Sequence, residues 1–164
     1  MPENKEMQCK MYSKNFSEIE LRESWIARNN KIVNLPPEYA KKNLRKLCKN
    51  ILQPIRDKWG DVICVNSGYR CKELNQKIGG VHNSQHLTGD AADICPKNRK
   101  DVQKLFDFIK TMIEKGEINV GQLILERAQE AIWVHVSNPR TDKDNNQIFV
   151  MNKNKDKQSK LQPT

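Results

Sequence analysis

The clearest hydrophobic pattern lies between Pro37 and Gly60, where apolar residues recur at steps of three and four. This spacing predicts an amphipathic helix of about 20 residues. The apolar positions are Ala40, Leu44, Leu47, Cys48, Ile51, Leu52, Ile55 and Trp59. Pro37 suits the first turn, where its missing N–H costs no hydrogen bond, and Gly60 ends the helix. Pro54 should kink the helix or end its first segment.

Two further segments show helical patterns. Residues 102–113 repeat the three- and four-residue spacing, and Gly116 ends this second amphipathic helix. Residues 17–20, with the sequence Ser-Glu-Ile-Glu, form a candidate capping box. We therefore expect a short helix that begins there and ends near Trp25 or Ile26.

Short apolar runs predict the strands. Residues 62–65 are β-prone, residues 91–95 are small and apolar, and residues 122–126 and 131–137 form two strands joined by a four-residue connection. A short helix is expected over residues 72–78. Helices early in the chain and short strands around one later helix predict an α+β fold, with a small, mainly antiparallel sheet flanked by helices.

The length of 164 residues suits a single domain. Residues 1–14 are polar and are expected to form a flexible N-terminus. Residues 15–150 hold the predicted elements, and the Lys- and Asn-rich residues 151–164 are interpreted as a flexible basic tail. We expect a monomer.

The net charge is +9, with 37% hydrophobic and 30% charged residues. A basic protein is attracted to polyanions such as nucleic acids, anionic lipid surfaces and bacterial wall polymers. The sequence has no helix-turn-helix pattern, zinc-finger spacing or aromatic RNA-binding run. Nucleic acid is therefore not expected as the partner.

The cysteines and the N-terminal residues indicate the cellular compartment in which the chain is synthesised. Five cysteines, an odd number with no CxxC pair, favour reduced thiols in the cytosol over a disulfide framework. The first residues lack the apolar segment of a signal peptide, and no apolar run approaches the ~20 residues that span a bilayer. We expect a cytoplasmic protein as synthesised, with no membrane span.

Two of the three histidines lie in unusual settings. His86 and Asp93 are seven positions apart, with Gly89 between them for a tight turn. On a strand, His135 would share one face with Trp133, and both would line a cleft. A catalytic zinc site uses three such protein ligands and leaves a fourth position open. From spacing alone, a hydrogen-bonded structural histidine remains the alternative.

Three motifs in order resemble the zinc D-Ala-D-Ala carboxypeptidase family. They are Ser-Gly-Tyr-Arg at 67–70, Gly-Gly at 79–80 followed by Ser-Gln-His-Leu-Thr-Gly-Asp-Ala-Ala-Asp-Ile at 84–94, and Trp-Val-His-Val-Ser at 133–137. The resemblance covers roughly residues 16–137 and is strongest to the small branch of bacterial and phage wall-lytic proteins. The same superfamily includes the dipeptidases of vancomycin resistance and the hedgehog signalling domain, so the resemblance implies a hedgehog/D,D-peptidase-like fold.

The resemblance also implies roles for single residues. His86, Asp93 and His135 match the zinc ligands of the family. Arg70 matches an arginine that binds and polarises the substrate near the scissile carbonyl. Tyr69 and Ser84 match positions that line the substrate pocket. The implied substrate is a peptidoglycan peptide cut next to D-Ala, and carboxypeptidase, endopeptidase and dipeptidase activities all remain open.

The catalytic acid departs from the family pattern. Many relatives carry Glu or Asp three residues before the last histidine ligand, whereas this chain has Ile132. Glu126 is the candidate general base, because a four-residue loop would place it opposite Ala131 and on the face of His135. Glu130, in the turn, is the second candidate.

The same departure keeps a second hypothesis open. Under this second hypothesis, the chain is a catalytically weak, zinc-containing module that binds the cell wall. In either case it acts on the cell wall, by a route that the sequence does not reveal.

Overall fold

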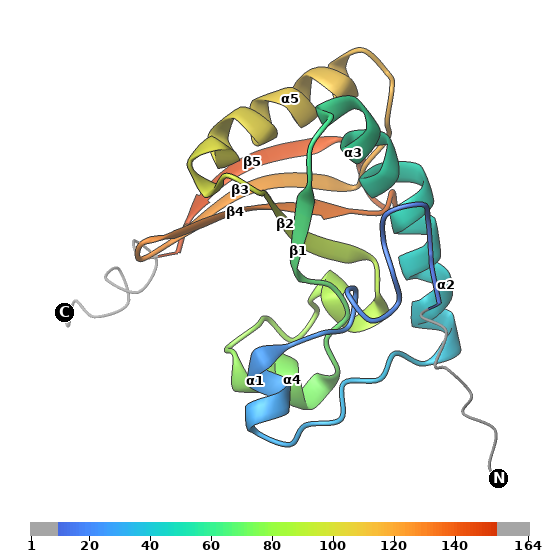
Figure 1. Ribbon diagram of the computed structural model, residues 1–164, viewed down its shortest axis with the longest axis vertical. Helices are drawn as coiled ribbons and strands as arrows, with labels where there is room; N and C mark the ends of the chain where they lie inside the picture. The colour runs from blue at the N-terminus through green and yellow to red at the C-terminus, as the bar shows by residue number, and fades with distance from the viewer. Residues whose placement is uncertain (1–9, 154–164) are drawn as a thin grey trace, which may run out of the picture.

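The computed structural model describes residues 10–153, which form a five-stranded sheet with helices (Figure 1). The elements in chain order are α1 (Trp25–Asn29), α2 (Glu38–Leu47), η1 (Cys48–Leu52), α3 (Gln53–Trp59), β1 (Ile63–Ser67), α4 (Lys72–Lys77), η2 (Gln85–Thr88), β2 (Ala91–Pro96), η3 (Arg99–Asp101), α5 (Val102–Glu114), β3 (Gln122–Ala128), β4 (Ala131–Ser137) and β5 (Gln147–Asn152). The predicted α+β fold is confirmed.

The sheet has the strand order β1-β2-β4-β3-β5, and only the β3–β5 pair is parallel. Helix α5 covers one face, against β2, β3 and β4 (Figure 1). The small helices α1 and α4 lie together in a separate part of the molecule, beyond the ends of β1 and β2. None of the helices in the described part of the chain is long and apolar enough to span a bilayer.

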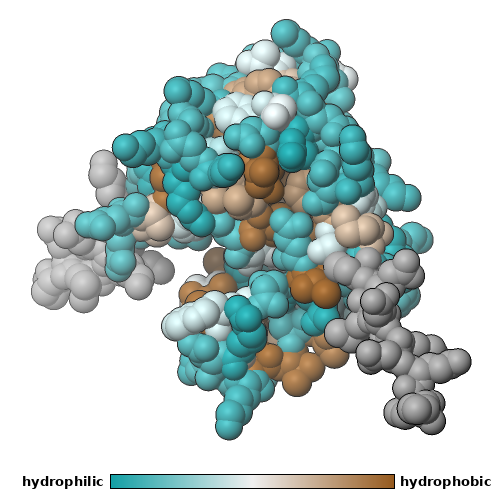
Figure 2. Space-filling view, in the orientation of Figure 1, coloured by the Kyte–Doolittle hydropathy of each residue, from teal (hydrophilic) through white to brown (hydrophobic). Residues whose placement is uncertain are grey.

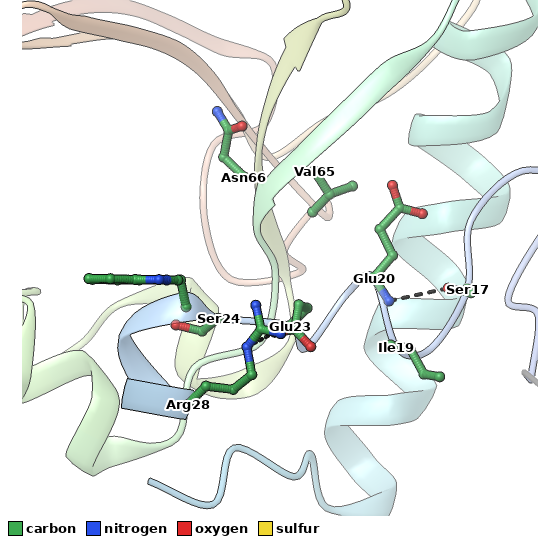
Figure 3. A pocket seen from close by; sticks show the side chains of 9 residues that line it. Ser17, Ile19, Glu20, Glu23, Ser24, Arg28, Val65 and Asn66 are labelled. Carbon is green, nitrogen blue, oxygen red and sulfur yellow. Dashed lines mark hydrogen bonds and ion pairs between the residues drawn. The ribbon is translucent and has the colours of Figure 1, made fainter. Parts of the chain in front are cut away.

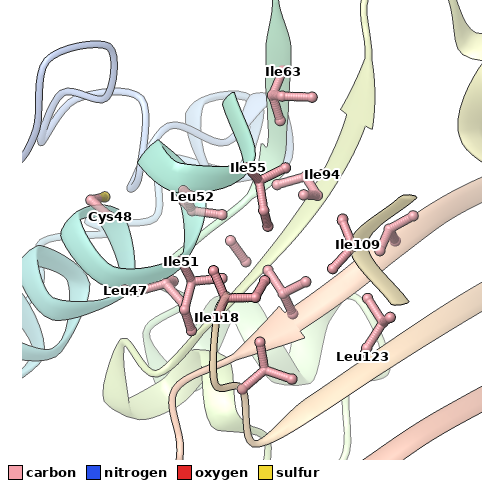
Figure 4. Packing of buried hydrophobic residues seen from close by; sticks show 14 of the residues in the cluster. Leu47, Cys48, Ile51, Leu52, Ile55, Ile63, Ile94, Ile109, Ile118 and Leu123 are labelled. Carbon is pink, nitrogen blue, oxygen red and sulfur yellow. The ribbon is translucent and has the colours of Figure 1, made fainter. Parts of the chain in front are cut away.

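The core lies between the covered face of the sheet and the helices. The apolar stripe of α2, η1 and α3 meets α5 and the inner side chains of the strands (Figure 4). Fully buried members from these elements include Leu47, Ile51, Ile55, Ile94, Ile109 and Leu123. Because one helical face and one strand face are buried together, the two amphipathic helices predicted from their spacing both form.

The long helix is continuous from Glu38 to Trp59, but its middle five residues are a π-helix, η1. Pro54 follows at the start of α3. Proline has no N–H, and its ring clashes with the carbonyl four residues earlier, which here belongs to Asn50. The wider π turn accommodates this clash, so the expected disturbance at Pro54 takes the form of a local widening.

The N-terminal part differs from the prediction. The expected helix over residues 17–26 is wrong, because only one turn follows Ser17 and α1 begins at Trp25. The carbonyl of Leu21 accepts the Tyr69 N–H at 2.7 Å, which takes this segment out of a helical pattern. Tyr12 is buried, so the flexible N-terminus expected over residues 1–14 does not include it; residues 1–9 lie outside the described part.

The C-terminal strands also differ. β3 and β4 are joined by two residues, Gln129 and Glu130, and the predicted four-residue connection is wrong because the ladder continues to the Ala128–Ala131 pair. β5 was not predicted at all. It extends to Asn152, two residues into the expected tail, while residues 154–164 lie outside the described part.

Candidate metal centre

Three elements bring the sequence-predicted ligands together on the face of the sheet opposite α5. Asp93 of β2 and His135 of β4 are direct cross-strand partners. His86 lies in η2, the short helix before β2. Gly89 ends η2 with φ of +74°, and a Cβ there would lie 2.5 Å from the Ala40 carbonyl oxygen. Glycine at this position therefore lets the chain turn back into β2.

The three side chains form one tight, buried cluster. Nε2 of His86 lies 3.2 Å from Oδ1 of Asp93, and Nδ1 of His135 lies 2.9 Å from the same oxygen. The possible ligand atoms all lie within 4.8 Å of one another. Ligands of a tetrahedral zinc ion are about 3.3 Å apart, given metal–ligand distances near 2.0 Å. His82, the remaining histidine, is exposed and does not belong to the cluster.

Two hydrogen bonds select the histidine tautomers. Nδ1 of His86 donates to the Gly68 carbonyl at 2.7 Å, and Nε2 of His135 donates to Oε1 of Gln85 at 3.0 Å. With neutral rings, the other nitrogen of each histidine is then an unprotonated acceptor that faces the carboxylate of Asp93. Three acceptors that converge in this way suit a cation between them, so the residues fit a zinc ion.

The electrostatics favour the ligand forms of these groups. Burial lowers the pKa of His86, which favours the neutral imidazole. Burial alone would raise the pKa of Asp93, but positive charge on the neighbouring imidazoles outweighs burial and holds this pKa well below its usual range; a metal ion bound between these groups would supply the same positive charge. Neutral histidine and ionised aspartate are the forms that bind metal.

Arg70 lies beside the cluster and is held on two sides. Its Nη2 contacts Oδ2 of Asp93 at 2.5 Å, and its Nε donates to Oγ of Ser67 at 2.7 Å. The backbone N–H of Arg70 also donates to the His86 carbonyl at 3.1 Å. Arg70 therefore orients the carboxylate that faces both histidines.

Gly68 connects the cluster to the N-terminal segment. Its carbonyl accepts the hydrogen bond from His86, and a Cβ at this position would collide with the Leu21 carbonyl. The next residue, Tyr69, donates its N–H to that same carbonyl. Only glycine permits this close approach, so the segment around Leu21 helps to place a partner of His86.

Tyr69 and Ser84, the two residues predicted to line the substrate pocket, lie in different environments. Tyr69 is buried, burial raises its pKa, and its carbonyl accepts a hydrogen bond from Asn34 at 2.9 Å. Ser84 caps η2, with its Oγ accepting the His86 N–H at 3.3 Å. Ser84 and Gln85 also line a hollow of about 280 Å³ outside the metal cluster.

Glu126 reaches the predicted face through a different register. It lies opposite Trp133, so the expected pairing with Ala131 is wrong by two residues. Because side chains alternate with a period of two, this shift leaves Glu126 on the face of Trp133 and His135. Its side chain is buried. The structure therefore places a carboxylate on the same sheet face as His135, diagonal to it across the β3–β4 pair, whereas Glu130 is exposed in the turn.

Lys153 completes this part of the site. Its Nζ contacts Oε2 of Glu126 at 2.5 Å and lies 5.0 Å from the ring centroid of Trp133. Ile132 faces the other way and packs against the core. Neither Lys153 nor Gln85 was identified as a site residue from the sequence. Lys153 lay in the predicted tail, and Gln85 has no distinguishing pattern around it.

Comparisons with known proteins agree with this geometry. The sequence model of a family described as Peptidase M15 matches residues 14–137, which is most of the chain and includes all three clustered ligands. A comparison with curated proteins gives no match.

Proposed function

Because the chain belongs to the peptidase M15 family, we propose that it is a zinc peptidase that cleaves amide bonds next to D-Ala in peptidoglycan peptides. The observation that carries this proposal is the convergence of two unprotonated histidine nitrogens on Asp93. The zinc ligands are His86, Asp93 and His135. The chemistry that zinc supplies in such sites is the activation of water and the polarisation of a carbonyl.

Glu126 is the proposed general base. It takes a proton from the attacking water and passes it to the leaving amine. Lys153 holds one carboxylate oxygen, Oε2, and so restricts the rotation of the carboxylate. Glu126 thus supplies the carboxylate that many relatives carry at the position of Ile132.

The remaining groups bind and orient the substrate. Arg70 holds Asp93 and contributes positive charge near the developing oxyanion. The indole N–H of Trp133 is buried and has no hydrogen-bond partner within residues 10–153, so it suits a substrate carbonyl. Tyr69, just after β1, and Ser84, the N-cap of η2, shape the surroundings of the cluster.

Mass spectrometry of muropeptides after incubation with the zinc-loaded protein tests this proposal. We expect loss of a terminal D-Ala or cleavage at a D-Ala cross-link, and the mass change identifies which bond is cut. His86→Ala should abolish both tight zinc binding and cleavage. Full activity with stoichiometric zinc in that variant would overturn the ligand assignment.

A zinc-containing wall-binding module is the second candidate, because Ile132 replaces the acid that many relatives use. Glu126→Gln separates the two functions. A peptidase loses turnover in this variant but keeps its zinc. If the protein is a binding module, the wild type and Glu126→Gln bind the cell wall equally well, and neither of them releases peptide products.

A further inference from the structure

A second hollow, of about 470 Å³, lies between α1 and the outer side of β1. Figure 3 shows the side chains of Glu20, Glu23, Arg28 and Asn66 around it, and Trp25 completes its lining. We call this hollow the Trp25 groove. None of the three metal ligands lines it.

The lining combines apolar side chains, of which the flat Trp25 indole is the most exposed, with planar polar groups. The indole of Trp25 is 67% exposed, which is unusual for so large an apolar side chain. Arg28 and Glu23 form an ion pair at 2.9 Å in the same lining. Asn66 is exposed, and because its Oδ1 already accepts from Cys95 and Arg99, its NH₂ group is the part left to bind a ligand. A pyranose ring has the matching surface, since its C–H face is apolar and its rim carries hydroxyl and amide groups.

A peptide strand suits this groove less well. β1 is an edge strand of the sheet, and edge strands commonly bind peptides through their free backbone groups. Here the lining is built mainly from side chains, among them the Trp25 indole and the Glu23–Arg28 ion pair, and β1 contributes only Val65 and Asn66 to it. The chemistry of the lining therefore favours a sugar.

The groove adjoins the metal centre along β1. Asn66 immediately precedes Ser67, which lies opposite Asp93 and accepts a hydrogen bond from Arg70. In Figure 2 the surface is hollowed between the part that holds the sheet and the part that holds α1 and α4. One ligand can thus occupy the groove while its extension reaches the metal ligands.

We propose that the Trp25 groove binds an N-acetylated hexosamine of the glycan strand whose stem peptide enters the metal centre. This inference rests on the proposed function for the identity of the polymer. The sugar stacks on Trp25, and Glu23, Arg28 and Asn66 bind its polar rim. The groove then makes the protein prefer peptides that are still attached to glycan.

Binding of the disaccharide N-acetylglucosaminyl-N-acetylmuramic acid, without any peptide, tests the site independently of cleavage. Titration followed by NMR should show saturable shifts of the Trp25 indole signal in the wild type. The accompanying shifts of the Arg28 backbone amide should be lost in Trp25→Ala, and the Trp25 indole shifts should be weakened in Asn66→Ala. Val33→Ala is the matched control, because Val33 is 73% exposed but does not line the groove. Absence of saturable binding in the wild type would overturn the proposal.

Kinetics on paired substrates connect the groove to the metal centre. The wild type should cleave a disaccharide-linked stem peptide with a kcat/KM about tenfold higher than the same free peptide, which corresponds to about 1.4 kcal/mol. Trp25→Ala should remove this preference by raising KM for the linked substrate only. An equal loss on both substrates would assign the groove to the peptide and reject the sugar site. If the disaccharide binds but neither substrate is cleaved, the proposed function fails and the sugar site stands.

Discussion

At the scale of single residues, Gly68 and Gln85 each accept a hydrogen bond from one of the two histidine ligands and so fix the orientation of its ring. The His86–Asp93 spacing and the strand position of His135 made a metal site one of two interpretations, and the resemblance to the zinc carboxypeptidase family selected it. The partners that select the tautomers, Gly68 and Gln85, come from a turn and from a position beside a ligand. Their roles depend on how η2 packs against α2 and β2, which no local pattern encodes.

Gln85→Ala should lower zinc affinity by about 10- to 100-fold, the usual cost of removing a hydrogen-bond partner of a metal ligand. The reason is that Nε2 of His135 loses its acceptor at 3.0 Å, so the ring can rotate. Competition with a chromophoric chelator measures the affinity. His82→Ala is the control, since that histidine is exposed. Unchanged affinity in Gln85→Ala would show that Gln85 does not orient His135.

Glu20→Gln should stabilise the protein at neutral pH but not in acid. Burial raises the pKa of Glu20, although hydrogen bonds from the Ser17 and Val65 backbone act in the opposite direction. A raised carboxyl pKa contributes stability that is present below the unfolded-state pKa and is lost as pH rises through the folded-state pKa. The wild type therefore loses this contribution between acid and neutral pH, and the variant does not.

Thermal unfolding of the zinc-loaded protein checks the sign. The advantage of Glu20→Gln over the wild type should grow between about pH 4 and pH 7. After discounting for solvent screening, we expect about 0.5 kcal/mol, or roughly 1–2 °C in Tm. Glu130→Gln, at an exposed position, should show no such trend. An advantage that is larger in acid would contradict the assignment.

At the scale of elements, segments with hydrophobic periodicity were predictable from the sequence, whereas segments that depend on tertiary contacts were not. Helices α2 to α3 and α5 bury one face each, so their spacing alone reveals them. The end of β3 and the whole of β5 depend on pairing with a neighbouring strand. Glu126 nevertheless reached the predicted face, because an error of two residues in register preserves strand alternation.

β5 has a direct part in the proposed site, since Lys153 follows it and contacts Glu126. Lys153→Met should lower kcat by about 10- to 100-fold and leave KM nearly unchanged, because the proposed base loses its fixed orientation. Lys153→Arg should restore much of the turnover. Lys110→Met, on exposed α5 surface, is the control for charge removal. A Lys153→Met variant with full kcat would remove Lys153 from the mechanism.

At the scale of the whole molecule, the charge of +9 predicts attraction to an anionic polymer. Retention on purified bacterial walls that still carry anionic polymers should fall steeply as salt rises, because the Debye length shrinks from about 10 Å at 0.1 M to about 3 Å at 1 M. Walls stripped of these polymers should retain less protein at low salt. Retention that is independent of salt would show that charge does not hold the protein on the wall.

The close approach of Gly68 to Leu21 makes the metal centre depend on the N-terminal segment of the chain. The Gly68 carbonyl holds His86, and its position relies on the segment around Leu21, which comes much earlier in the chain. Leu21 is at the same time a fully buried member of the core, so one residue ties the metal site to the packing of the molecule. A protease cut within that segment would therefore loosen His86 and the core together, and metal content would report the integrity of the N-terminal region.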